Sequence, residues 1–103
     1  MSDTAIKAMA KIMRRLNHAA NENDKDKLRK IIAGDMTSEN EKILARSLLN
    51  YQDSVAEIDK QHLSAILEDK LATDNERNLA EIILHFDQKT KTRAQYKLHL
   101  ILK

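Results

Sequence analysis

The sequence predicts an all-α protein built from three tandem helical hairpins with a period of 35 residues. Its 103 residues include one glycine and no proline, whereas sheet proteins need many turn residues. Apolar residues recur at spacings of three and four, which is the pattern of an amphipathic helix. Residues 24–52 also match residues 59–87 at an offset of 35, and a fixed period indicates a repeat architecture.

The internal repeat rests on nine identities in 29 aligned positions. The identical pairs are Asp24 and Asp59, Lys25 and Lys60, Leu28 and Leu63, Ile31 and Ile66, Asn40 and Asn75, Glu41 and Glu76, Leu44 and Leu79, Ala45 and Ala80, and Leu49 and Leu84. One further period forward leads to Leu98 and Ile101, and one period back leads to Met9 and Met13. The repeat is therefore expected to extend to both ends of the chain, and the alternative is that a run of amphipathic helices produces some periodic leucines by chance.

The chain divides into one domain of three hairpins, over residues 3–37, 38–72 and 73–103. Each hairpin is expected to contain a cap, a longer helix, a turn and a shorter helix. One hairpin cannot bury its apolar face alone, so the hairpins must stack. Two arrangements fit: a short right-handed α-solenoid with contacts between neighbours only, or a compact six-helix bundle whose third hairpin folds back on the first.

The first hairpin begins with a helix expected over about residues 3–20. Its apolar face consists of Ile6, Met9, Met13, Leu16 and Ala20. Asp24 can cap the second helix by accepting a hydrogen bond from a free amide of the first turn. Gly34 is expected to close that helix in the left-handed conformation.

The second hairpin begins at Ser38, which has a glutamate three residues later and so forms a predicted capping box. The apolar stripe that follows either runs to Ile58 without a break or ends near residues 50–53. Both alternatives fit the pattern. In the second case a new helix begins at about Ser54 or Asp59.

The third hairpin carries another predicted capping box, made by Thr73 and Glu76. A polar linker over residues 87–91 follows the first helix of this hairpin. Thr92 is expected to cap the last helix, with Gln95 as its partner. A tetratricopeptide pattern requires tryptophan and proline, and this chain has neither. The sequence thus resembles α-helical repeat proteins in general and no particular family.

Charge is distributed unevenly, although the net charge is only +2. Residues 1–30 carry a net charge of +4, residues 31–87 carry −7, and residues 88–103 carry +5. Two basic ends therefore flank an acidic middle. Such asymmetry concerns partners rather than fold, and it permits either binding of an acidic partner or head-to-tail self-association.

Basic residues supply the candidate binding site. Lys7, Lys42 and Arg77 occupy the same position in the three hairpins, and in a stack they would form a column able to hold a phosphate backbone or an acidic helix. The alternative is that these residues only keep the surface solvated. The candidate residues are Lys7, Lys11, Arg14, Arg15, Lys42, Arg46, Arg77, Lys89, Lys91, Arg93 and Lys97.

Catalytic and metal-binding patterns are weak in this sequence. Cysteine is absent, and a single glycine is too few for a phosphate-binding loop. His18 with Glu22 and Glu81 with His85 are four residues apart, but no Glu-x-x-His pattern of a dimetal bundle occurs. Solvated surface pairs are the favoured interpretation. We therefore expect no catalytic residue, no cofactor and no metal.

These observations predict a small non-catalytic helical-repeat interaction module or regulator with a protein partner. A nucleic-acid-binding protein is the alternative, and a metal-dependent enzyme is a remote one. The absence of cysteine fits a reducing cytoplasm. No apolar run approaches the roughly 18 residues of a membrane span.

Overall fold

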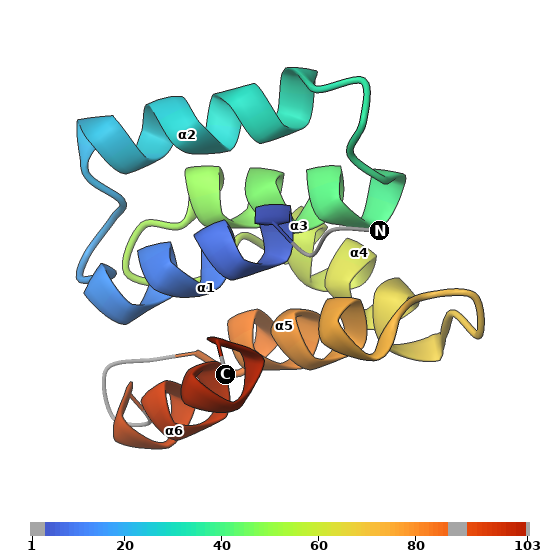
Figure 1. Ribbon diagram of the computed structural model, residues 1–103. Helices are drawn as coiled ribbons and strands as arrows, with labels where there is room; N and C mark the ends of the chain where they lie inside the picture. The colour runs from blue at the N-terminus through green and yellow to red at the C-terminus, as the bar shows by residue number, and fades with distance from the viewer. Residues whose placement is uncertain (1–3, 87–90, 103) are drawn as a thin grey trace.

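The computed structural model describes residues 4–86 and 91–102, and for residues 91–93 the backbone alone. It contains α1 (Thr4–Arg15), α2 (Glu22–Ala33), α3 (Glu39–Asn50), α4 (Glu57–Glu68), α5 (Asp74–Leu84) and α6 (Lys91–Leu102) (Figure 1). These described ranges contain no strand. The predicted all-α class is confirmed.

The helices recur with the predicted period. The first helices of the hairpins begin at Thr4, Glu39 and Asp74, which are 35 residues apart. Every helix has 11 or 12 residues, so the expected difference between a longer and a shorter helix is wrong. Leu16 and Val55 follow the first helices of their hairpins and are buried. They lie in the connecting segments and not in an additional helical turn.

The helices pack in a closed cycle (Figure 1). The second helix of each hairpin lies on the first helix of the next, so α2 packs on α3, α4 packs on α5, and α6 returns to α1. The three first helices, α1, α3 and α5, also contact one another. The described part of the chain measures 32 × 30 × 27 Å. The structure is therefore the compact six-helix bundle and not the open solenoid, because closure covers apolar faces that an open stack leaves exposed at its ends.

Equivalent core positions are buried alike in all three hairpins. Leu28, Leu63 and Leu98 each have a relative exposure of 0%. Tyr51 and Phe86 are also equivalent, and their rings meet edge to face with centroids 5.6 Å apart. Equivalent residues of neighbouring hairpins therefore touch inside the core.

Both predicted capping boxes are confirmed. Ser38 Oγ accepts a hydrogen bond from the Glu41 amide, and the Glu41 carboxylate accepts one from the Ser38 amide. Thr73 and Glu76 repeat this exchange at the start of α5. Glu76 is buried and also accepts hydrogen bonds from Ser38 Oγ at 2.8 Å and Asn40 Nδ2 at 3.2 Å. The cap of α5 thus joins the second and third hairpins.

The first hairpin departs from the sequence prediction at three points. Helix α1 ends at Arg15, because the chain turns there and the carbonyl of His18 accepts a hydrogen bond from the Asp53 amide of the next hairpin. The cap of α2 is Asn21, whose side chain accepts a hydrogen bond from the Asp24 amide. Gly34 has φ −71° and ψ 138°, which is extended and not left-handed.

Helix ends in the other two hairpins agree with the prediction in one case and differ from it in two. Helix α3 ends at Asn50, which confirms the alternative with a break near residues 50–53 and rules out a stripe that continues to Ile58. Helix α4 begins at Glu57 after Ala56, which makes no side-chain cap, and Ser54 is not its cap. Thr92 lies inside α6 and therefore does not cap it. Sequence capping patterns therefore place these helix starts only to within a few residues.

Candidate binding groove in the first hairpin

A cationic groove lies between α1 and α2. It has a volume of about 410 Å³ and is lined by Thr4, Lys7, Ala8, Lys11, Arg15 and Lys27. Lys7, Lys11 and Arg15 follow one another at intervals of four residues, which places them on one face of α1. Lys27 lines the same groove from α2. The spacing of basic residues in α1 therefore places three cations in a row, and the packing of α2 beside α1 adds Lys27.

Three of these cations have no counterion in the part of the chain that the structure describes. Lys7, Lys11 and Lys27 are exposed, and none of them forms an ion pair there. Like charges that share a groove repel one another and attract anions. The groove is thus electrostatically suited to an anionic ligand.

Arg15 differs from the lysines because it is held in place by Asp24. Arg15 Nη2 lies 2.7 Å from Asp24 Oδ1, and Nε lies 3.4 Å from Oδ2. The Asp24 side chain is 4% exposed, whereas that of Arg15 is 48% exposed. The second hairpin has the equivalent contact between Asn50 and Asp59, at 3.4 Å. This contact is therefore a structural feature of the repeat, and in the first hairpin it also positions a cation.

The groove continues toward the turn between α2 and α3 as a larger, mainly apolar region of about 740 Å³. Thr4 and Ala8 line both regions, so we treat them together as the α1–α2 groove. Its apolar end includes Ala5, Ile31 and Met36, with Lys30, Asp35 and Glu41 among the other lining residues. The groove thus combines a cationic end with an apolar end.

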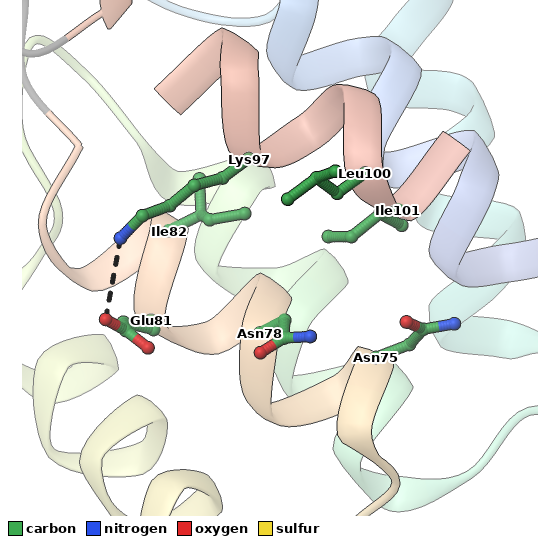
Figure 2. A pocket seen from close by; sticks show the side chains of 7 residues that line it. All are labelled: Asn75, Asn78, Glu81, Ile82, Lys97, Leu100 and Ile101. Atoms are coloured by element: carbon green, nitrogen blue, oxygen red, sulfur yellow. Dashed lines mark ion pairs between the residues drawn. The ribbon is translucent and has the colours of Figure 1, made fainter. Parts of the chain in front are cut away.

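The third hairpin has an equivalent groove with different charges (Figure 2). It has a volume of about 260 Å³ and lies between α5 and α6. Lys97 Nζ lies 3.6 Å from Glu81 Oε1, and this ion pair bridges the two helices. Lys11 and Lys27 stand two periods earlier in the sequence. The first hairpin therefore has two cations where the third has a neutralised pair.

The structure does not bring the predicted column of Lys7, Lys42 and Arg77 into one groove. Lys42 Nζ lies 3.9 Å from a Glu39 carboxylate oxygen. Arg77 pairs with Asp74 at 2.9 Å and donates a hydrogen bond to the Asp69 carbonyl. Neither residue lines the α1–α2 groove. Thr4 stands where the other two hairpins have these acids, and so Lys7 lacks such a partner.

The remaining predicted residues lie outside the groove. Arg14 and Arg46 are exposed on α1 and α3 and do not line it. Lys97 belongs to the equivalent groove of the third hairpin. Lys89, and the side chains of Lys91 and Arg93, lie outside the described residues.

Lys27 closes the cationic end from α2 and is not among the binding residues predicted from the sequence. A signal for it was present, because Lys97 was a candidate and stands two periods after Lys27. The apolar end was also missed. No pattern along a single helix shows that Ala8 of α1 and Ile31 of α2 line one cavity, since that depends on the approach of the two helices.

His18 and Glu81, one member of each possible histidine–carboxylate pair, contact residues farther along the chain. His18 Nδ1 lies 2.5 Å from Asp53 Oδ1, a residue one period later, and Glu81 pairs with Lys97. Within residues 4–86 and 91–102, no group of three or more potential metal-ligating side chains was found. A helix with the length and apolar character needed to cross the bilayer is likewise not found in these ranges.

No protein-family model, curated protein or solved structure matches this chain. The description of this protein therefore rests on its own fold and groove. It is an all-α protein of three cyclically packed hairpins, and its first hairpin carries a cationic and apolar groove.

Proposed function

We propose that this protein is a small, cytoplasmic, non-catalytic interaction module that binds an acidic segment of a protein partner in the α1–α2 groove. One observation carries the proposal: Lys7, Lys11 and Lys27 share this groove and have no ion pair among the described residues. An acidic segment would supply the missing countercharge.

The composition of the groove favours a protein partner over a nucleic acid. Single-strand binders stack bases on aromatic side chains, and no aromatic residue lines either end of this groove. Tyr96 is exposed, but it lies on α6 and outside the groove. The apolar end offers Ala5, Ile31 and Met36 to aliphatic side chains, which a polypeptide has and a sugar–phosphate backbone lacks.

Fluorescence anisotropy with a synthetic peptide rich in glutamate and leucine tests this proposal. We expect the double variant Lys11→Glu/Lys27→Glu to bind the peptide at least about tenfold more weakly, because both cations become repulsive. The matched control is Arg46→Glu/Lys70→Glu. It changes the net charge equally at two exposed positions outside the groove, so we expect a change of less than about twofold.

Two results would contradict the proposal. Equal weakening by both double variants would show that affinity follows the overall charge and not the groove. A single-stranded oligonucleotide of equal charge that binds more tightly than the peptide, and displaces it, would instead support the nucleic-acid alternative. Circular dichroism of each variant would show that its helices are retained.

A further inference from the structure

We infer that the bound segment is an amphipathic α-helix that lies along the α1–α2 groove, with its apolar face on Ala5, Ala8 and Met36 and its acidic side chains toward Lys7, Lys11 and Lys27. This inference rests on the proposed function, because it specifies the form of the acidic partner.

The first hairpin has room for an additional helix. Helix α2 packs mainly on α3 and contacts α1 only lightly, and the two regions of the groove measure about 410 and 740 Å³. Ala5 and Ala8 lie one turn apart on α1. The equivalent positions hold Asn75 and Asn78 on α5, where the groove measures only about 260 Å³. Small side chains on α1 therefore form a shallow floor on which another helix can approach closely.

The walls of the groove favour a helical ligand over an extended one. An extended segment gains affinity from main-chain hydrogen bonds at an exposed sheet edge. The walls here are helices, in which most backbone groups already bond one another. A helix satisfies its own backbone and can lie in a groove through its side chains alone.

The charge spacing matches the period of a helix. Lys7 and Lys11 are four residues apart on α1, and Lys27 faces the same space from α2. Glutamates four residues apart on a bound helix would therefore meet successive lysines. Helix α1 has 12 residues and is about 18 Å long, which allows contact over about three turns.

Met36 supplies an apolar contact at the far end of the groove. It is 97% exposed, and the Thr37 hydroxyl holds the turn that carries it, because its single proton is shared between the carbonyls of Ile31 and Gly34, at 2.8 and 2.9 Å from Oγ1. An apolar side chain held in water on an ordered turn is stabilised when a partner covers it.

A second copy of this chain offers a poorer match to the groove than a separate acidic helix. Five of its exposed acids already pair with a cation three residues later: Glu22 with Lys25, Asp26 with Arg29, Glu39 with Lys42, Glu57 with Lys60, and Asp74 with Arg77. A carboxylate that already pairs with a cation attracts the lysines of another molecule less strongly. The charge complementarity therefore favours a partner whose acids are not neutralised.

Two synthetic peptides of identical composition, each about four helical turns long, test the inference. One places glutamates and leucines on opposite helical faces, and the other distributes them over all faces. We expect the first to bind at least about tenfold more tightly and to gain helicity on binding. Equal affinities, with the Lys11→Glu/Lys27→Glu variant still defective, would overturn the helical form but leave the proposed function standing. Affinity insensitive to that variant would overturn both.

A matched pair of surface variants tests the apolar contact. Met36 and Leu71 are equivalent residues of successive turns, and both are more than 90% exposed. Met36→Ser should weaken binding of the amphipathic peptide about five- to tenfold, whereas Leu71→Ser should leave it unchanged. Equal effects of the two variants would overturn the inference. So would a concentration-dependent dimer that Lys11→Glu/Lys27→Glu dissociates in sedimentation, because a second copy would then be the occupant.

Discussion

The first and third hairpins share their buried positions but differ in the groove between their helices. Leu28 and Leu98 are equally buried. The third hairpin joins its helices with the Glu81–Lys97 ion pair, whereas the first has Lys11 and Lys27 at the equivalent positions. Residues that face the neighbouring hairpins are constrained by close packing, and residues that face outward are not. The two hairpins therefore differ where packing leaves the choice of side chain free.

Repulsion between the like charges of the first hairpin's groove should lower the free energy of unfolding, whereas the ion pair of the third hairpin should not. Repulsion between exposed lysines is weak in water, and salt screens it. An arrangement that costs some stability and attracts anions is typical of a binding site. Three measurements of the free energy of unfolding test the difference between the two hairpins.

The largest effect is expected for the shared core. Leu28→Ala, Leu63→Ala and Leu98→Ala should each lower the free energy of unfolding by about 3 kcal/mol, because each removes a fully buried side chain. Urea denaturation measures this, and Leu100→Ala, at a position that is 49% exposed, is the control. A Leu98→Ala effect as small as that of the control would show that the third hairpin does not share the core, and the comparison would fail.

A smaller effect is expected at the Arg15–Asp24 contact. Arg15→Ala should lower the free energy of unfolding by about 2 kcal/mol, because it leaves the buried Asp24 carboxylate without its charged partner. The neighbouring Arg14→Ala should change it by less than about 0.5 kcal/mol, since Arg14 has no ion pair among the described residues. Similar values for both variants would mean that Arg15 is only another surface cation.

The smallest effect is expected for an exchange of charge between the two grooves. Lys11→Glu reproduces the arrangement of Glu81 and Lys97 in the first hairpin and should raise the free energy of unfolding by about 0.5 kcal/mol at low salt. Glu81→Lys should lower it by a similar amount. Both changes should shrink at high salt because the charges are exposed. Destabilisation by Lys11→Glu would show that the lysines of the first groove do not repel each other.

Much of the fold could be predicted from the sequence because its signals are local. The capping boxes at Ser38 and Thr73 depend on residues three positions apart. Helix ends were less predictable. Asn21 and Asp24 are both good caps by composition, but Asp24 is used to hold Arg15. A choice between two suitable residues depends on a contact nine positions away in the sequence, which no local pattern contains.

The candidate site was only partly predictable. Lys7, Lys11 and Arg15 follow from the helical period of α1 and were among the expected binding residues. Lys42 and Arg77 share the position of Lys7, but each lies beside a carboxylate three residues earlier. These three residues are therefore equivalent in sequence position, but Lys42 and Arg77 pair with a neighbouring acid and Lys7 has no such pair among the described residues.

The all-α class, the 35-residue period and most of the core positions follow from the sequence alone, because they depend on the spacing of apolar residues and on caps within a few positions. The three-dimensional packing, in contrast, is needed to show that α6 returns to α1 and that a groove remains between α1 and α2. Closure depends on how well distant helix surfaces pack together, and that fit is a property of three-dimensional shape which the hydrophobic period does not specify.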